Sequence, residues 1–209
     1  MIQHTHLGAL KALPLVLGAI ALAFGCGDIP GDADETGSVI NVEMITGVYD
    51  GQDSNTVDAV QDLCVQEEGP VEAEPFFDHF ARALITNRSL PNSTEQSASP
   101  VYIHSYTVTY QLAGNVPAPN LDPYVEVPLL DSRGIEPCQS GSQCAPTEYV
   151  GLKFMDVAKR AEYVSKGGDP FQEATYNINY TFRGENLFGE DFTFGGSTNF
   201  TITDYDNCD

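Results

Sequence analysis

Cysteine thiols are the side chains whose positions most clearly indicate chemistry in this chain. Cys26 follows an apolar run, Ala12 to Phe24, which is shorter than the roughly 20 apolar residues that a bilayer-spanning helix needs. Small residues close this run, as they do in a signal peptide. The segment Leu22-Ala23-Phe24-Gly25-Cys26 resembles a lipobox, in which the cysteine thiol receives a diacylglycerol group. We therefore expect residues 1–25 to be a lipoprotein signal peptide and Cys26 to carry the lipid.

The lipobox departs from its commonest form, which has Leu three residues before the cysteine, where this chain has Ala23. An ordinary signal peptide with an unmodified cysteine is the alternative. A retained transmembrane helix is disfavoured, because an acidic stretch follows the apolar run and no cationic cluster does. Gly27, rather than Asp, follows Cys26, so the usual inner-membrane retention signal is missing. We expect a lipid-anchored protein of the cell envelope, at the outer membrane rather than the inner one.

Four further cysteines, Cys64, Cys138, Cys144 and Cys208, indicate disulfides, because an even number in an exported chain predicts a disulfide framework. Four cysteines allow three pairings. The polar segment Gln-Ser-Gly-Ser-Gln between Cys138 and Cys144 closes a loop easily, so we expect that pair, and Cys64 with Cys208. The sequence contains no Cys-x-x-Cys motif, the spacing that would suggest a metal site instead of disulfides.

The charge balance is strongly acidic, with nine Lys and Arg against thirty Asp and Glu and a net charge of −21. Cleavage before Cys26 would remove Lys11 and leave eight basic residues against thirty acidic ones, a net charge of −22. Such a surface repels phosphate backbones, so we expect no nucleic-acid partner. High charge also keeps a tethered domain soluble, which is the simplest explanation for it.

Oxygen ligands gather around Gly51, where Asp50, Asp53, Asn55 and Asp58 could hold calcium. Calcium is the one cofactor that we consider, because carboxylate and amide oxygens are its usual ligands. The spacing does not match an EF-hand loop. A polar turn without a metal is the alternative and the more common outcome.

No catalytic or cofactor motif is present in the sequence, and we expect no enzyme activity. His79 has Asp78 beside it, but adjacent strand residues point to opposite faces and make no dyad. His104 lies in an alternating segment and is expected to be structural. A carboxylate-pair glycosidase is the remaining enzymatic alternative, although nothing singles out two of the thirty acids.

Alternating segments predict an all-β domain over residues 39–209, after an acidic tether at residues 26–38 that is expected to be disordered. Tyr106, Val108, Tyr110 and Leu112 share one face of the clearest strand. Four residues of the C-terminal part, Tyr176, Ile178, Tyr180 and Phe182, alternate in the same way. Short strands separated by turn residues are typical of an antiparallel β-sandwich.

Expected strands are Val39–Ile45, Phe76–Thr86, Tyr102–Leu112, an edge strand at Tyr124–Val127, Tyr149–Met155, Ala174–Arg183, Glu190–Phe194 and Asn199–Thr203. Phe76–Thr86 also fits a helix, but the turn residues after it favour a strand. Asp156–Lys166 fits either a helical turn or an extension of the preceding strand. Gly184-Glu185-Asn186 is expected to be a turn, and Gly195-Gly196-Ser197 to separate the last two strands.

Two segments, SPVYIHSYTVTY (Ser99–Tyr110) and YNINYTFRGENLFGEDFTFGGSTNFTITDY (Tyr176–Tyr205), resemble uncharacterised exported bacterial lipoproteins with a single immunoglobulin-like sandwich domain. TVDAVQDLC (Thr56–Cys64) and EPFFDHFARALITN (Glu74–Asn87) resemble the opening of the same domain. The resemblance covers most of the exported part and implies the immunoglobulin-like fold. It implies no catalytic residue.

Two function classes follow from these observations. The first is a structural or protein-interaction module of the cell envelope, anchored to the membrane by its lipid. The second is an envelope domain that binds a polysaccharide, another small ligand or calcium. A row of exposed tyrosines near carboxylates would favour the second class, whereas a flat apolar patch or an unprotected edge strand would favour the first.

Overall fold

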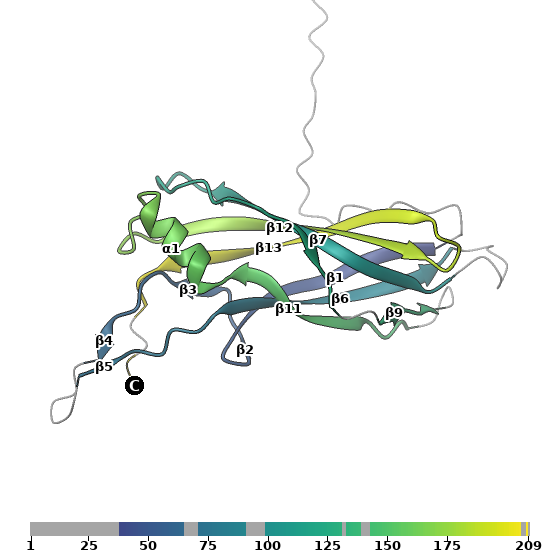
Figure 1. Cartoon of the computed structure of the whole chain (residues 1–209), viewed down its shortest axis with the longest axis horizontal. Helices are drawn as coiled ribbons and strands as arrows, with labels where there is room; N and C mark the ends of the chain where they lie inside the picture. Colours follow the sequence, from purple (N-terminus) through teal and green to yellow (C-terminus); the bar gives the residue numbers. More distant parts are fainter. Residues whose placement is uncertain are drawn as a thin grey trace, which may run out of the picture.

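The computed structural model describes residues 38–64, 71–90, 99–130, 133–138, 143–205 and 208. Over these residues two β-sheets pack face to face, and one short helix covers one end of the sandwich (Figure 1). The expected all-β, disulfide-linked sandwich is therefore confirmed. The predicted signal peptide, the lipidation site Cys26 and the tether before Ser38 lie outside the described residues.

The first sheet is built around β6, which pairs with β1 on one edge and with β11 and β10 on the other. All of these pairs are antiparallel except β10 with β6, and β2 adds a short extension to the end of β1. The strands of this sheet are β1 (Ser38–Tyr49), β2 (Gln52–Asp53), β6 (His79–Ser89), β10 (Pro137–Cys138) and β11 (Thr147–Met155).

The second sheet has the order β3-β13-β12-β7-β8, with β9 beside β7, and only β3 runs parallel to its neighbour. Its strands are β3 (Thr56–Asp58), β7 (Val101–Ala113), β8 (Tyr124–Pro128), β9 (Gly134–Ile135), β12 (Ala174–Asn186) and β13 (Asp191–Thr203). A separate hairpin pairs β4 (Leu63–Cys64) with β5 (Glu72–Ala73). As expected, Tyr124–Pro128 is an edge strand.

The core lies between the two sheets and is rich in aromatic rings. The alternation predicted for β12 is confirmed, because Tyr176, Ile178, Tyr180 and Phe182 are all buried. Tyrosine hydroxyl groups also join the sheets: Tyr180 donates to the Lys153 carbonyl at 2.7 Å. Buried phenols retain their partners in this way, so the aromatic core leaves these polar groups satisfied.

Glycine positions account for two predictions that the structure shows to be wrong. The expected break at Gly195–Ser197 lies inside the continuous strand β13, where Gly196 faces β1 so closely that a Cβ would lie 2.6 Å from Val42 Cγ1. The expected turn at Gly184–Asn186 belongs to β12, and a Cβ on Gly184 would lie 2.2 Å from the Tyr102 carbonyl oxygen. Both glycines permit close approach of neighbouring strands rather than turns.

The segment after β11 is a helix, α1 (Val157–Ser165), and not an extension of the strand. Asp156 is its N-cap and accepts a hydrogen bond from the Lys159 amide at 2.9 Å, as capping carboxylates do. Asp78 accepts from the Val157 amide at 2.8 Å. The strand expected at Phe76–Thr86 is confirmed, although β6 begins at His79.

The sandwich has two distinct ends (Figure 1). At the Ser38 end, β1 begins opposite Ser89 and the β12–β13 turn follows Asn186. At the opposite end, the helix end, α1 bonds to the end of β3 and to the loop between β7 and β8, and the β4–β5 hairpin extends from the same end. Since the described chain starts at Ser38, everything at the helix end lies across the length of the sandwich from that point.

Candidate functional site

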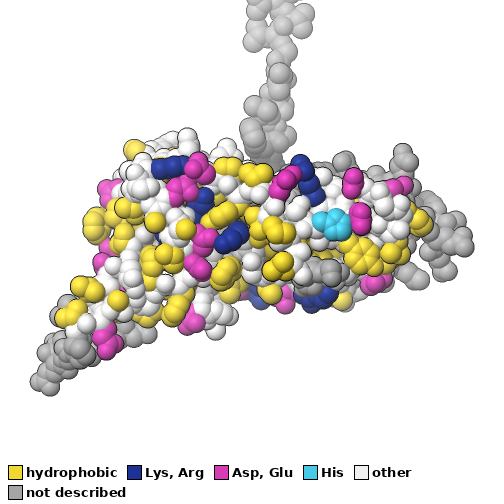
Figure 2. Space-filling model, viewed as in Figure 1, with side chains coloured by type: hydrophobic (Ala, Val, Ile, Leu, Met, Phe, Trp, Pro, Cys, Tyr) yellow, Lys and Arg dark blue, Asp and Glu magenta, His cyan; other side chains and the backbone are white. Residues whose placement is uncertain are grey.

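An open groove of about 370 Å³ lies at the helix end, beside α1. One wall is formed by α1 and the other by the segment after β3 together with Phe76; the lining residues are Ala59, Val60, Gln61, Phe76, Val157, Ala161, Val164 and Ser165. The lining is mostly apolar. Figure 2 shows apolar side chains over this end of the molecule, around α1 and along the β4–β5 hairpin.

A buried arginine supports one wall of the groove. Arg160 is fully buried, and its guanidinium lies 3.6 Å from the centre of the Phe76 ring. It donates to the Asp58 carbonyl at 3.2 Å and to the Phe77 carbonyl. These bonds fix the end of β3 and the segment before β6 next to the groove. The cation–π contact holds the Phe76 ring in place as part of the groove wall.

A pair of buried carboxyl groups lies on the same side. Asp58 is 4% and Glu74 is 1% exposed, and a hydrogen bond joins their side chains. Burial, with the hydrogen bond to Glu74, raises the pKa of Asp58 to about 7. Glu74 also accepts from the Asp62 amide at 3.0 Å, and its carbonyl accepts from the Gln61 side chain at 3.0 Å. The pair therefore positions the chain segment that forms the second groove wall.

His79 lies next to this cluster and is buried among aromatic rings. Its ring centre is 4.3 Å from that of Tyr49 in an edge arrangement. Burial, together with the positive charge of Arg160, lowers the pKa of His79 to about 4, so the ring is neutral near pH 7. Asp78 is exposed and bonds α1 instead, so the two neighbours face apart as the sequence predicted.

The inner face of α1 carries charged side chains, and Lys159 is paired within the helix. Lys159 Nζ lies 2.6 Å from Glu162 Oε2 and 4.5 Å from the Tyr124 ring centre. Burial raises the pKa of Glu162, but hydrogen bonds from Lys159 and Lys166 outweigh it and lower that pKa to about 2. Lys166 also pairs with Asp122 at 2.8 Å. The Lys166–Asp122 pair, and the hydrogen bond that Lys159 Nζ donates to the Asp122 carbonyl at 2.8 Å, attach α1 to the loop between β7 and β8.

The four predicted calcium ligands have separate protein partners. Asp53 pairs with Arg82 at 2.5 Å, and Asn55 Oδ1 accepts from the Gly47 amide at 2.8 Å. Asp58 is buried against Glu74, whereas Asp50 is exposed in the turn. Among the described residues, no group of three or more His, Cys, Asp or Glu side chains is arranged to hold a metal ion.

Calcium binding at this turn therefore stays a prediction that this geometry does not favour. If the site exists, calcium should raise the melting temperature of the wild type and magnesium should not. The Asp53→Ala variant should lose this increase.

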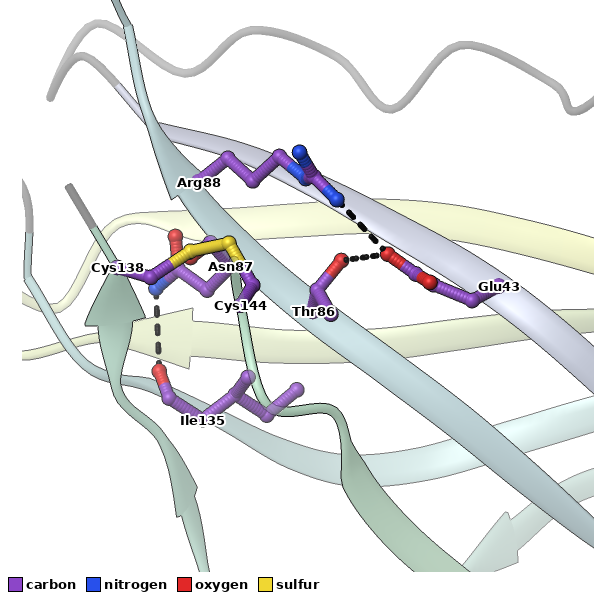
Figure 3. Close-up of a disulfide and its surroundings, with 7 residues drawn as sticks. All are labelled: Glu43, Thr86, Asn87, Arg88, Ile135, Cys138 and Cys144. Atoms are coloured by element: carbon purple, nitrogen blue, oxygen red, sulfur yellow. Dashed lines mark hydrogen bonds and ion pairs between the residues drawn. A yellow bond between two sulfur atoms is a disulfide. The ribbon is translucent and has the colours of Figure 1, made fainter. Parts of the chain in front are cut away.

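The two disulfides join Cys64 with Cys208 and Cys138 with Cys144, the pairing that the sequence predicted. Cys64–Cys208 fastens the β4–β5 hairpin to the C-terminal segment at the helix end. Cys138–Cys144 lies at the Ser38 end beside Asn87, whose amide nitrogen donates to the Ile135 carbonyl at 3.1 Å (Figure 3). Each end of the sandwich thus has its own covalent link.

The groove was not predicted from the sequence, although a signal for it was present. Asp156 is a good N-cap, and Val157, Ala161 and Val164 recur at helical spacing after it. That pattern predicts a helix with an apolar stripe, and such a stripe normally faces the core. The structure instead places the stripe at the surface, in the groove.

Two discriminating observations expected from the sequence now have an outcome. All ten tyrosines are buried or half-buried, so they form no exposed row of the kind that stacks on sugars. The structure has an apolar groove instead of the flat apolar patch that would favour a protein-interaction module.

No family model, curated protein or solved structure matches this chain in the comparisons. Within the described part of the chain, no helix has the length and apolar character needed to cross a membrane.

Proposed function

We propose that this chain is a cell-envelope lipoprotein, anchored by lipid on Cys26, whose sandwich domain is a protein-interaction or structural module without catalysis. The lipobox residues support the anchor, and Gly27 after Cys26 supports the outer membrane. An anchor that precedes Ser38 joins the sandwich at the end opposite the groove. The groove is then left accessible to a partner.

We also propose that the sandwich is immunoglobulin-like. The strand order supports this: β1, β6 and β11 lie in one sheet, and β13, β12, β7 and β8 lie in the other. In chain order these correspond to strands A, B and E facing G, F, C and C′ of such a domain. The disulfides lie elsewhere than the bridge between B and F that antibody domains have.

The groove beside α1 is the observation that carries the proposed interaction function. Its lining is mostly apolar and open to solvent, and Phe77, which follows the lining residue Phe76, is also exposed. Soluble domains seldom leave such surface exposed unless another molecule covers it.

The anchor is tested with Cys26→Ser. This variant should either leave the membrane fraction or accumulate as an uncleaved precursor, measured by fractionation and by its migration in gels. Wild-type behaviour in both measurements would refute the lipid anchor.

The interaction function is tested by capture from the protein's own envelope. The wild type, Val164→Glu and Phe188→Glu are compared, because Phe188 is 65% exposed but lies at the Ser38 end. We expect a stoichiometric partner that Val164→Glu loses and Phe188→Glu keeps. Equal capture by all three chains would refute the groove as the binding surface.

A further inference from the structure

Helix α1 has its two faces inverted relative to an ordinary surface helix. It buries Lys159, Arg160 and Tyr163 and exposes Val157 and Val164, which are 41% and 39% accessible. With Ala161 between them, these valines follow the i, i+4, i+7 spacing of an apolar helix stripe. A stripe of this kind normally faces the core. Here the core side is occupied by Lys159, Arg160 and Tyr163, which bond to other parts of the chain, so the stripe is left facing solvent.

The opposite wall is preformed, and two of its backbone amides are already bonded within the chain. Phe76 is held by the Arg160 guanidinium, and Ala59 is fixed by its amide, which donates to the Thr203 carbonyl at 2.8 Å. The Asp62 amide is already bonded to Glu74. A partner therefore gains little from backbone pairing, and side chains must fill the groove. This favours a helix laid against α1 over an added strand.

The rim of the groove is acidic. Asp62 follows the lining residue Gln61, and Asp78 bonds the amide of Val157. Both residues are exposed, and in the described part of the chain neither has a salt-bridge contact within 4.0 Å, although the charge of Asp78 also acts on Lys153 and Arg160. Lys166, the cation next to Ser165, is already shared between Asp122 and Glu162. An occupant with positive charges would meet complementary potential here.

The net charge of each candidate partner indicates which of them the groove favours. A second copy of the chain would bring its own net charge of −21 to the interface, and an anionic bilayer would be repelled by the same surface. A basic polypeptide has neither disadvantage. The nine residues of α1 span about 13 Å at 1.5 Å per residue, which matches two to three turns of a partner helix.

We propose that the groove binds a basic amphipathic helix, whose apolar side chains pack between α1 and Phe76 while Lys or Arg residues at its edges face Asp62 and Asp78. This proposal rests on the proposed interaction function and names the chemistry of the partner. The helix-in-groove mode uses anchors at i, i+3 or i+4, and i+7, the spacing that α1 itself presents.

Synthetic helical peptides test this proposal on the full chain purified in detergent. Three fluorescent peptides are titrated: an amphipathic Leu/Lys helix, a Leu/Glu helix of the same pattern, and a scrambled Leu/Lys peptide. We expect the first to bind at least tenfold more tightly than the other two. Its affinity should fall at least tenfold in Val164→Glu and Ala161→Glu, severalfold in Asp62→Asn with Asp78→Asn, and not at all in Phe188→Glu.

Each other outcome overturns the proposal. Equal binding of the scrambled peptide would mean attraction to the acidic surface in general, and preference for the Leu/Glu helix would mean that the rim does not select charge. Binding to phosphatidylglycerol vesicles that Val164→Glu abolishes would identify a lipid occupant instead. If no peptide binds but envelope capture still depends on Val164, the interaction function stands and the partner chemistry is wrong. If capture is also independent of Val164, both fail.

Discussion

The two ends of the sandwich differ in the polar side chains that they bury: neutral ones at the Ser38 end, and charged ones at the helix end. At the Ser38 end, Val101 and Ile135 are fully buried, and the Asn87 amide satisfies the carbonyls of Ser99 and Ile135 at 2.9 and 3.1 Å. At the helix end, Lys159 and Arg160 are buried and apolar side chains of α1 face solvent. Folding alone explains the first arrangement. Phe188 is exposed at the Ser38 end too, but at the helix end the exposed apolar side chains line a groove, as a binding surface requires.

The largest expected difference between the ends is in their disulfides. Cys64–Cys208 closes a loop with a sequence separation of 144, and Cys138–Cys144 one with a separation of 6. Chain entropy predicts losses of about 5 and about 2.4 kcal/mol respectively when each is replaced by serines. Urea unfolding of the two double variants measures both. Equal losses would mean that the helix end does not depend on its longer link.

Buried polar anchors provide a matched pair of variants. Arg160→Ala and Asn87→Ala each leave two main-chain carbonyls without their donor. Each should lower the free energy of unfolding by about 2–4 kcal/mol. Only Arg160→Ala also releases Phe76, so only this variant should weaken binding of the Leu/Lys peptide under conditions where both remain folded. Equal weakening in both would show that binding follows overall stability instead of the groove wall.

The pH dependence of stability should also come from the helix end. Because the pKa of Asp58 is raised from 3.8 to about 7 in the folded state, the folded chain binds this proton more strongly. Asp58 therefore lowers stability progressively as pH rises from about 4 to 7, with no further change above.

His79 acts in the opposite direction over an overlapping range. Its pKa is lowered from 6.5 to about 4, so its contribution to stability is complete above pH 6.5 and is lost as pH falls toward 4. Asp58→Asn should leave only the His79 slope, so stability should increase from pH 4.5 to 6.5 more steeply than in the wild type. Thermal unfolding across this range measures it, and identical slopes in the two chains would contradict the buried acid pair.

The smallest expected effect is on the stripe itself. Val164→Gln replaces an apolar side chain that faces the groove, and Gln has the higher helix propensity. The free energy of unfolding should change by no more than about 0.5 kcal/mol, as at other surface positions. A loss above about 2 kcal/mol in chemical denaturation would mean that the stripe is part of the core.

The sequence predicted the strands well where alternation was regular. The inward sets of β12 and of β7 from Tyr106 onward follow from period two, whereas Val101 and Ile103 become inward-facing through a register shift. The short Gly-Ser loop between Cys138 and Cys144 indicated the disulfide pairing. The roles of Gly184 and Gly196 were predicted wrongly because the sequence shows only that a glycine is present. It does not show whether a close neighbouring strand or a turn requires that glycine.

The groove could not be predicted for a different reason. Burial of Arg160 depends on Phe76 and Asp58, which are distant in sequence and meet it only in the folded chain. An apolar stripe beside charged residues is normally assigned with the apolar side inward. The inversion of α1 is therefore a property of the tertiary structure.

Site-specific photocrosslinking in living cells tests the central claim most directly. A benzophenone side chain is placed at position 164 in one variant and at position 188 in another, so that each reports on one end of the sandwich. We predict a discrete crosslinked protein from position 164 and none from position 188. Discrete crosslinks from position 188 alone, or none from either, would contradict the assignment of the helix end as the interaction surface.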